Sequence, residues 1–453
     1  HNGGMMAISE AQPRHQLLKI LGVTFGVAVA VGDMLGSGIL RAPSSVASSV
    51  PDIGLVMALW TFGAVHVAIT ANVFAEMGTA LPKSGGAYIY AQRVFGDIGG
   101  LVVGWSSWLA FIAGIAAAAI SFANFLPLIW PWASGHTVGV ALSMLIALFG
   151  ANILGLREGR ALQEATSLIK ASMLVLFCVA AVLFVPSSHP MPLAAMAGAP
   201  VLGWMAAVGA YQLIRGAYAG WDTPLFFGEE IVNPGRDIPR AMFIGIAITV
   251  VLYIGVNAAL LYALGVKGVA STPLPFTIVV KTFGGLASIL FAVTAMITVS
   301  SCANANIMGG PRIIFSMARD GLLPDFFQSV NTGGSPTGAM LLTALFSVGV
   351  TLSGTFNLVF GLIGTMNALG GIIVIAGLFV LRRREPDLPR PYRAWLYPLL
   401  PVVALILETT TLILYSAADT TGILFAIGLC LACIPFALIA RRGRIRLGDI
   451  APR

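Results

Sequence analysis

Three basic residues interrupt long apolar stretches of the sequence. They are Arg41, Lys170 and Arg215, and Asp33 and Asp222 lie close to two of them along the chain. If these stretches cross a bilayer, each cation costs about 3 kcal/mol or more at its centre, so it needs a partner, a wet cavity or a function. These residues are therefore the first candidates for a functional site inside the membrane.

Two glycine-rich segments carry these charges. The first, VGDMLGSGIL, covers residues 31–40, and the second, RGAYAGWDTP, covers residues 215–224. Glycine weakens a helix by roughly 1 kcal/mol relative to alanine, and proline by about 3 kcal/mol, so both segments are predicted to be unwound. The N–H groups after such a break suit a carboxylate, and the carbonyl groups before it suit an ammonium group. For the first segment alone, close helix packing through Gly32 and Gly36 explains the glycines equally well.

The elements that must hold these segments are predicted to be transmembrane helices. Of the 453 residues, 58% are hydrophobic and only 9% are charged, too few to cover a water-soluble surface. Most of the apolar runs reach the ~20 residues that cross the hydrocarbon core, and unpaired backbone groups in lipid exclude an open sheet. Twelve crossings are expected, at residues 17–45, 53–80, 98–127, 136–155, 161–185, 203–230, 241–265, 285–311, 337–356, 358–381, 395–416 and 421–440.

Basic residues between the apolar runs predict the topology. With a cytoplasmic N-terminus, the segments on the inner side hold 20 basic residues and the outer loops hold two, Lys267 and Lys281. This distribution is a strong positive-inside signal, so both termini are predicted to be cytoplasmic and the net charge of +7 indicates topology, not nucleic-acid binding. The four cysteines fall inside apolar runs, which argues against both disulfides and a zinc site.

The two interrupted segments fall in the first and sixth predicted helices. These helices correspond to each other if helices 1–5 and 6–10 are two copies of one unit, the second inverted because five is odd. Interrupted helices at matching places in two inverted halves are typical of the midplane binding site of a carrier.

Several further strings complete a resemblance to the amino acid–polyamine–organocation superfamily of permeases, including its L-type and cationic amino acid transporters. GSGI at 36–39 resembles the first-helix motif of that family, and PKSGGAYIYAQRVFG at 82–96 resembles its re-entrant segment. AYAGWD at 217–222 and GEEIVNPGRDIPRAM at 228–242 are similar to its sixth helix and the following loop. ARDGLLP at 318–324 and LRRREPDLPRPYR at 381–393 resemble segments after its eighth and tenth helices.

The resemblance implies the fold and the division of the chain. The fold class is all-α integral membrane, with 12 transmembrane helices, a 5+5 inverted repeat with broken helices 1 and 6, and two C-terminal helices. Residues 1–16 are expected to be a cytoplasmic tail with a tag remnant, and residues 17–393 the transport core, with repeats at about 17–186 and 200–381. Residues 394–440 would form helices 11 and 12, and residues 441–453 a basic cytoplasmic tail.

The resemblance also implies a substrate site. The carboxylate would be held by the amides of Ser37, Gly38 and Ile39, next to Gly36. The ammonium would be held by carbonyls near Met34, Gly216 and Ala219. The unwound turn of the sixth helix would add Tyr218, Gly220, Trp221 and Asp222. Lys170 matches a lysine that sodium-independent members carry on the fifth helix, where its ammonium stands in for sodium and bridges toward the first break and the eighth helix.

The chain departs from the family at charged positions. Many relatives have an aromatic gate residue where this chain has Gly216. Arg41 and Arg215 are expected on the outer side of the breaks, where they either bind a second substrate charge, pair within the gate, or neutralise Asp33 and Asp222. Asp33 is counted with the possible gate charges, as are two glutamates that are expected to join Arg236 or another cytoplasmic arginine, Glu229 and Glu230.

Four further polar residues have open alternatives. His66 is either a packed, hydrogen-bonded imidazole or a proton relay. Asn304 and Asn306 either lie near the site or serve in capping and interhelical hydrogen bonds, and Glu76 is expected to be a surface or loop anchor.

The expected function is secondary transport of amino acids or related amines by alternating access. Sodium independence follows from Lys170, whereas exchange and proton symport stay open. A polyamine or other organic-cation carrier of the same fold is the alternative. An enzyme or a channel is disfavoured, because the chain lacks a Walker loop, clustered carboxylates and a filter loop, and its five histidines are scattered. We expect no cofactor, metal or nucleic acid, and a location in the bilayer of the bacterial inner membrane, with the substrate and an accessory subunit left open.

Overall fold

The protein is described here by a computed structural model, which covers residues 17–186, 203–353 and 356–418 and single positions 424, 427, 428, 431 and 434. The tails at 1–16 and 441–453 lie outside the described residues, as does most of the expected twelfth helix. The described part is helical, with two isolated β-bridges and no strand. Its α-helices are α1 (Val23–Met34), α2 (Ser37–Ser49), α3 (Ile53–Ala80), α4 (Ala87–Phe125), α5 (Thr137–Leu154), α6 (Leu156–Phe184), α7 (Trp204–Ala217), α8 (Pro234–Ala270), α9 (Phe276–Lys281), α10 (Gly285–Arg319), α11 (Thr337–Ser353), α12 (Phe356–Arg384) and α13 (Leu399–Ala418).

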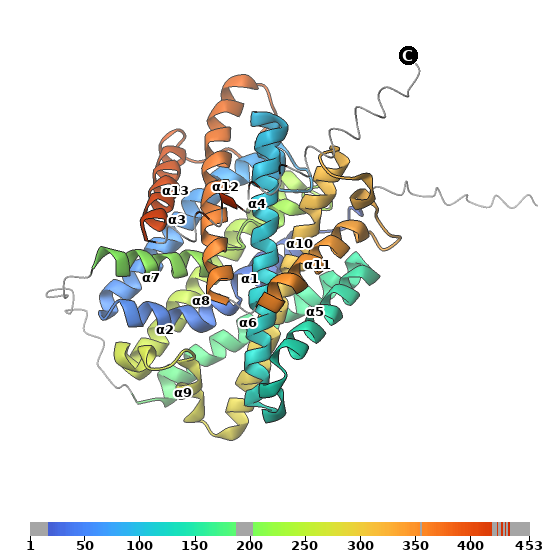
Figure 1. Ribbon diagram of the computed structural model, residues 1–453. Helices are drawn as coiled ribbons and strands as arrows, with labels where there is room; N and C mark the ends of the chain where they lie inside the picture. Colours follow the sequence, from blue (N-terminus) through green and yellow to red (C-terminus); the bar gives the residue numbers. More distant parts are fainter. Residues whose placement is uncertain are drawn as a thin grey trace, which may run out of the picture.

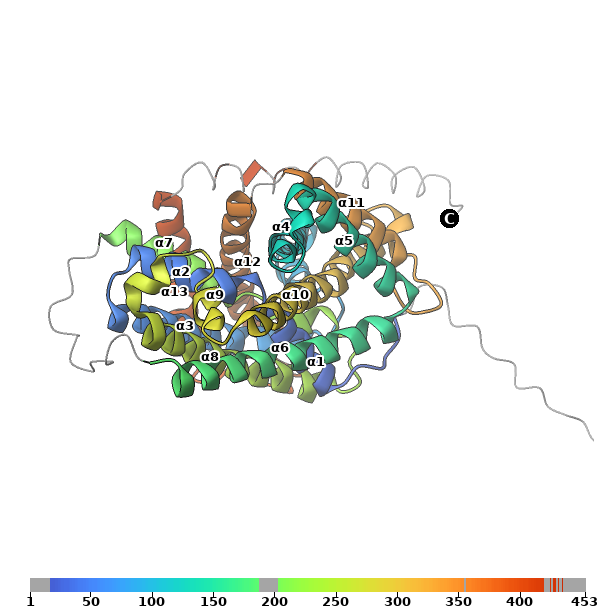
Figure 2. The ribbon, with the colours of Figure 1, turned by 90° about the horizontal axis from the view of Figure 1, so that it is seen from below.

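The helices form a bundle in which α4 and α10 occupy the middle. Figure 1 shows α4 running through the bundle, and Figure 2, turned by 90°, shows it nearly end-on beside α12. The short helices α1 and α2 pack on α8, and α13 packs on α12 and α3. Four short 3₁₀ turns connect helices, of which η3 (Thr223–Phe226) follows the second glycine-rich segment.

Nine helical segments of the described chain are long and apolar enough to cross a membrane, with α1 and α2 counted as one. The distribution of side chains on α6 supports this environment. Its Leu168, Leu176 and Leu183 are each about two thirds or more exposed, at 70%, 68% and 68%, while Lys170 on the same helix is 0% exposed. Apolar side chains that face outward and a charge that faces inward fit a helix surrounded by lipid. The chain is a multi-pass membrane protein.

The expected helices and the observed ones differ at several ends. The predicted sixth crossing is a short helix, α7, followed by turns. The crossing predicted at 98–127 is part of α4, which begins at Ala87 and is interrupted at Gly96. The crossing predicted at 241–265 is likewise part of α8, which begins at Pro234 and is interrupted at Gly265. These helices extend beyond the apolar runs because polar residues continue the helix outside the hydrocarbon.

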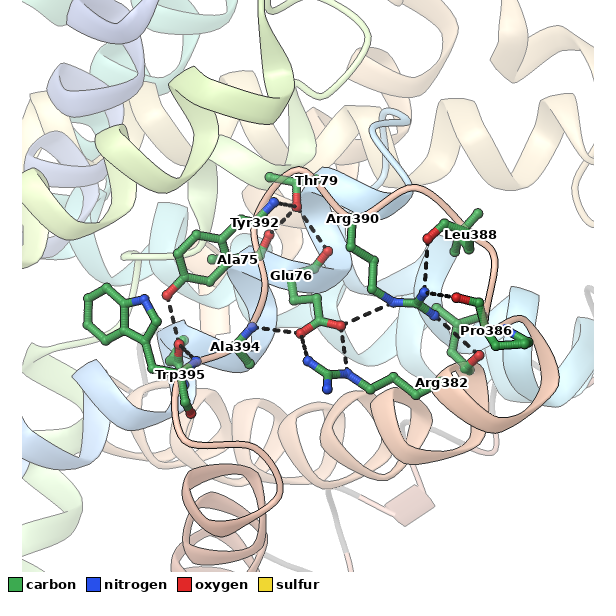
Figure 3. Close-up of polar contacts among 12 residues, drawn as sticks. Ala75, Glu76, Thr79, Arg382, Pro386, Leu388, Arg390, Tyr392, Ala394 and Trp395 are labelled. Atoms are coloured by element: carbon green, nitrogen blue, oxygen red, sulfur yellow. Dashed lines mark hydrogen bonds and ion pairs between the residues drawn. The ribbon is translucent and has the colours of Figure 1, made fainter.

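The loop after α12 is held against the end of α3 by a buried carboxylate. Glu76, which is 0% exposed, accepts from Arg382 at 2.9 and 2.5 Å and lies 3.2 Å from Arg390. It also accepts from the backbone N–H of Ala394 at 2.7 Å (Figure 3). Glu76 is therefore a loop anchor, one of the two roles expected, and it is not at the surface.

Candidate functional site

The first glycine-rich segment interrupts a helix, as predicted. Helix α1 ends at Met34 and α2 begins at Ser37, with Leu35 and Gly36 in non-helical conformations between them. The first N–H groups of α2 have no partner inside the helix, and they carry the positive end of its dipole. They therefore form a site for an anionic group at the break between α1 and α2.

Lys170 of α6 fills the other side of this break. Its Nζ donates to the carbonyl of Gly32 at 2.5 Å and to the carbonyl of Leu35 at 2.8 Å. These are carbonyl groups that the end of α1 leaves without helical partners. The buried ammonium thus supplies hydrogen-bond donors to backbone oxygens that would otherwise lack them.

The second glycine-rich segment lies directly against the first. After α7 ends at Ala217, the chain turns through Gly220, whose φ of +104° is a conformation that favours glycine. A Cβ atom on Gly220 would lie 2.7 Å from Cβ of Asp33. The hydroxyl of Tyr253 on α8 lies 2.5 Å from the carbonyl oxygen of Met34 and 2.8 Å from that of Ala217. The two breaks therefore share one hydrogen-bonding group and form one region.

A cavity of about 80 Å³ opens between the two breaks. At roughly 10–15 Å³ for each water, it holds about five to eight water-sized groups, which matches a small amino acid. Its walls come from α4, α10 and α12, which bring Ser107, Phe111, Gly114, Cys302, Asn306 and Asn367. Of the predicted site residues, the cavity is lined by Asp33, Met34, Gly36, Ser37, Gly38, Gly216, Ala219, Gly220 and Asp222.

Asp33 is a wall of this cavity and is held from two sides. Its carboxylate accepts from the hydroxyl of Thr223 at 2.6 Å and from the side-chain amide of Asn306. The thiol of Cys302 lies 3.3 Å from its backbone carbonyl oxygen. Asp33, predicted as a possible gate charge, lines the same cavity as Ser37 at the α2 N-terminus. Two alternatives were open for Asn306, a position near the site or a role in capping or interhelical hydrogen bonds. Its side-chain amide donates to Asp33 and lines the cavity.

Several predicted site residues do not line this cavity. Ile39 is buried and does not line the cavity. Tyr218 is also buried, with its ring against Trp60 and Tyr253. Trp221 lines a second cavity, and Lys170 acts on the backbone of the break behind the cavity wall.

The chain was compared with known proteins. The model of the family described as "Amino acid permease" matches residues 22–436. The chain belongs to the amino acid permease family. The permease is 28% identical over 428 residues to the large neutral amino acids transporter small subunit 2 of Rattus norvegicus, covering 91% of this chain and 79% of that one. It is 25% identical over 402 residues to the serine/threonine exchanger SteT of Bacillus subtilis (strain 168), covering 86% and 89%.

A third relative is the Asc-type amino acid transporter 1 of Mus musculus, 28% identical over 414 residues, covering 87% of this chain and 76% of that one. The family match confirms the predicted resemblance to the amino acid–polyamine–organocation superfamily. With these relatives it also confirms the predicted function, the transport of amino acids.

A second cavity of about 40 Å³ lies next to the first in this permease. Both are lined by Ser107, Ala219, Asp222 and Asn367. The second cavity adds Arg215 and Glu408, whose nearest atoms are 2.8 Å apart. Arg215 thus pairs with a residue of α13, not with either aspartate of the breaks. Arg41 lies on α2 and lines neither cavity.

Aromatic rings line one side of the site, and two ion pairs, one of them buried, lie near these rings in the chain. Phe111 and Phe226, which line the first cavity, pack edge to face with ring centroids 4.9 Å apart. Near Phe226 in the chain, Glu230 binds Arg312 at 3.1 and 3.2 Å, with exposures of 0% and 3%. Glu229 binds Arg319 at 2.7 Å. The two glutamates therefore join other arginines than Arg236, which binds Asp237 at 2.7 Å.

Replacing Arg312 with glutamine is expected to destabilise the permease by about 3–5 kcal/mol, because the Glu230 carboxylate would stay buried without its cation. Thermal unfolding of the purified protein measures the effect. The double replacement of Arg312 and Glu230 by glutamines should recover part of the loss. An equal loss in the single and double variants would contradict this account of the pair.

Several residues of the two cavities escaped sequence analysis. Glu408 carried a usable signal, because it is an acid within the apolar run LILETTT, like the three basic residues that were noticed. Cys302 of the first cavity carried none, and neither did Tyr253, which contacts both breaks. Both residue types are common in apolar helices, and only the packing of the helices brings them to the breaks.

Proposed function

We propose that the permease binds the α-amino acid zwitterion in the cavity between the two breaks and carries it by alternating access. The N–H groups of Ser37 and Gly38 receive the carboxylate, and Asp33 with the nearby carbonyls receives the ammonium. One observation carries the proposal: the N-terminus of α2 and the carboxylate of Asp33 line the same cavity. The volume of about 80 Å³ favours small side chains.

The proposal includes sodium independence and an overall plan. The ammonium of Lys170, bonded to the carbonyls of Gly32 and Leu35, occupies the place where a sodium ion would need oxygen ligands. We infer twelve crossings in a 5+5 inverted repeat, both termini in the cytoplasm and a bacterial inner membrane. The distribution of basic residues and the two interrupted helices support this plan.

An organic-cation carrier is a second candidate. It is favoured by the charge of the first cavity, which has Asp33 and Asp222 but no lysine, arginine or histidine among its described lining residues. Two carboxylates in one site attract an amine even where it has no carboxylate of its own. Amino acids and diamines therefore both belong in the binding test.

Small neutral amino acids are expected to raise the unfolding temperature of the purified permease, because a ligand at 100 times its dissociation constant adds about 2.7 kcal/mol. Asp33→Asn should weaken this binding about 10- to 100-fold, since a hydrogen bond to a charged group contributes about 1.5–3 kcal/mol. Asp97→Asn, at an exposed position on α4, is the matched control.

Counterflow of radiolabelled substrate into preloaded liposomes provides the second readout. Stabilisation by diamines but not by amino acids would favour the second candidate. The absence of saturable counterflow for both classes would overturn carrier function at this cavity.

A further inference from the structure

A cluster of buried titratable groups lies at the second cavity, which two of them, Arg215 and Glu408, line, and substrate binding at the breaks does not use it. Arg215 of α7 places its Nη2 2.8 and 3.0 Å from the two carboxylate oxygens of Glu408 on α13. His66 of α3 places Nε2 3.2 Å from the same carboxylate and Nδ1 2.5 Å from the hydroxyl of Tyr211. Exposure is 0% for His66, 1% for Glu408 and 9% for Arg215.

The charges of the two cavities do not balance. Their charged lining residues are three acids, Asp33, Asp222 and Glu408, and one base, Arg215. Lys170 adds a second positive charge at the first break. With every group ionised, these described residues have a formal net charge of −1, and a zwitterionic substrate does not change it. A buried, unbalanced charge within the membrane is costly, and one bound cation neutralises the set.

A proton fits this requirement better than a metal ion. Both oxygens of Glu408 already accept from the guanidinium of Arg215, which would repel a metal ion coordinated there. The imidazole of His66 instead offers a base whose ordinary pKa lies near neutrality. When neutral, its Nδ1 can accept from Tyr211 while Nε2 lies 3.2 Å from Glu408, and a proton taken up by the ring turns that proximity into an ion pair.

The groups that face His66 and Glu408 come from every side of the cavity. They are Tyr211 and Arg215 of α7, Tyr415 of α13, Thr70 of α3 and Asp222 of the second break. Among the described residues, α12 contributes to this cavity only side chains that do not titrate, namely Gly364, Met366, Asn367, Gly370 and Gly371.

We propose that the Glu408–His66 pair is the proton-binding site that couples transport to the pH gradient; the proposal rests on carrier function at the breaks. Alternating access moves the broken helices relative to the rest of the bundle. As α7 moves, Arg215 leaves Glu408 for Asp222, which lines both cavities. A proton taken up on His66 then replaces the guanidinium as the partner of Glu408. The return of Arg215 releases it on the other side.

The test uses the full chain in liposomes, with the membrane potential clamped and the pH outside lowered by one unit. One proton per substrate gives an accumulation of up to about tenfold, because one pH unit corresponds to a tenfold concentration ratio. A pH-sensitive dye inside the liposomes should record proton entry when substrate is added. Without a pH gradient, counterflow should continue.

His66→Gln is expected to remove both the accumulation and the proton entry while keeping counterflow within about threefold of the original chain. Its matched control is His136→Gln, on an exposed turn, which should accumulate substrate normally. Glu408→Gln is expected to have the same effects as His66→Gln. If Glu408→Gln fails to fold, the loss of accumulation in His66→Gln and in Tyr211→Phe still tests the proposal.

Three results would overturn the proposal. They are accumulation that follows a sodium gradient, accumulation by the original chain that ignores the pH gradient, and full accumulation by His66→Gln. Failure of the proposed function differs from all three, because counterflow itself would then be missing.

Discussion

Gly38→Ala is expected to reduce transport about 10-fold or more while the permease still inserts and folds. A Cβ atom on Gly38 would lie 2.8 Å from Cα and 3.0 Å from Cβ of Ala217, at the end of α7. The first of these atoms belongs to the backbone, so no side-chain rotation relieves the contact. The two breaks must separate by several tenths of an ångström, and displacements approaching 1 Å in a site that positions a ligand cost about 100-fold.

Initial rates of counterflow in liposomes measure this effect, with size-exclusion profiles as the check on folding. Gly349→Ala on α11 is the matched control, because a Cβ atom there meets nothing within 4 Å. Its rate should equal that of the original chain. A Gly38→Ala variant that keeps half of the original rate would mean that the two breaks do not have to touch during transport.

The positions of the two breaks could be predicted from sequence because the information is local. Glycine and proline raise the free energy of a helix wherever they occur, so VGDMLGSGIL and RGAYAGWDTP indicate unwinding without knowledge of any neighbour. Lys170 was also accessible to sequence analysis, since an isolated cation in an apolar helix needs acceptors. Its acceptors, the carbonyls of Gly32 and Leu35, are groups that the first break frees.

The partners of the charged groups could not be predicted in the same way. Arg215 and Glu408 are 193 residues apart, and their contact depends on how α13 packs against α7. Apolar membrane helices lack the alternation of polar and apolar faces that marks a buried side. The sequence therefore does not determine which face each helix presents to its neighbours. For the same reason the contacts of the Asp33 carboxylate with Thr223 and Asn306 could not be predicted from its neighbours in the chain.

The resemblance to known permeases supplied backbone positions more accurately than side-chain roles. Ser37, Gly38 and Gly216 line the first cavity as the motif implies. Tyr218 instead packs against Trp60, and its hydroxyl lies 3.3 Å from the carbonyl oxygen of that residue. A motif fixes where the chain unwinds, while each side chain follows the local packing of its own helix bundle.

Lys170→Met is expected to lower the rate of transport about 100-fold or more and to destabilise the permease by about 2–6 kcal/mol. Methionine keeps the volume and removes the donor, so the carbonyls of Gly32 and Leu35 stay buried without the ammonium, at about 1–3 kcal/mol each. The backbone of the break is then free to recover helical hydrogen bonds. Such a change would move the N–H groups of Ser37 and Gly38 away from the substrate carboxylate.

Counterflow rates and unfolding temperatures measure the two effects separately, with Lys281→Met, at an exposed position of α9, as the matched control. Lys170→Gln separates charge from hydrogen bonding, because its amide can still donate to one carbonyl. It should recover part of the stability, but little of the transport if the positive charge is also needed near Asp33. Transport by Lys170→Met within threefold of the original rate, without sodium, would show that the ammonium does not hold the break open. Sodium independence would then require a different physical cause. Without Lys170 the carbonyl oxygens of Gly32 and Leu35 would be available to a sodium ion, and transport would nevertheless proceed without sodium.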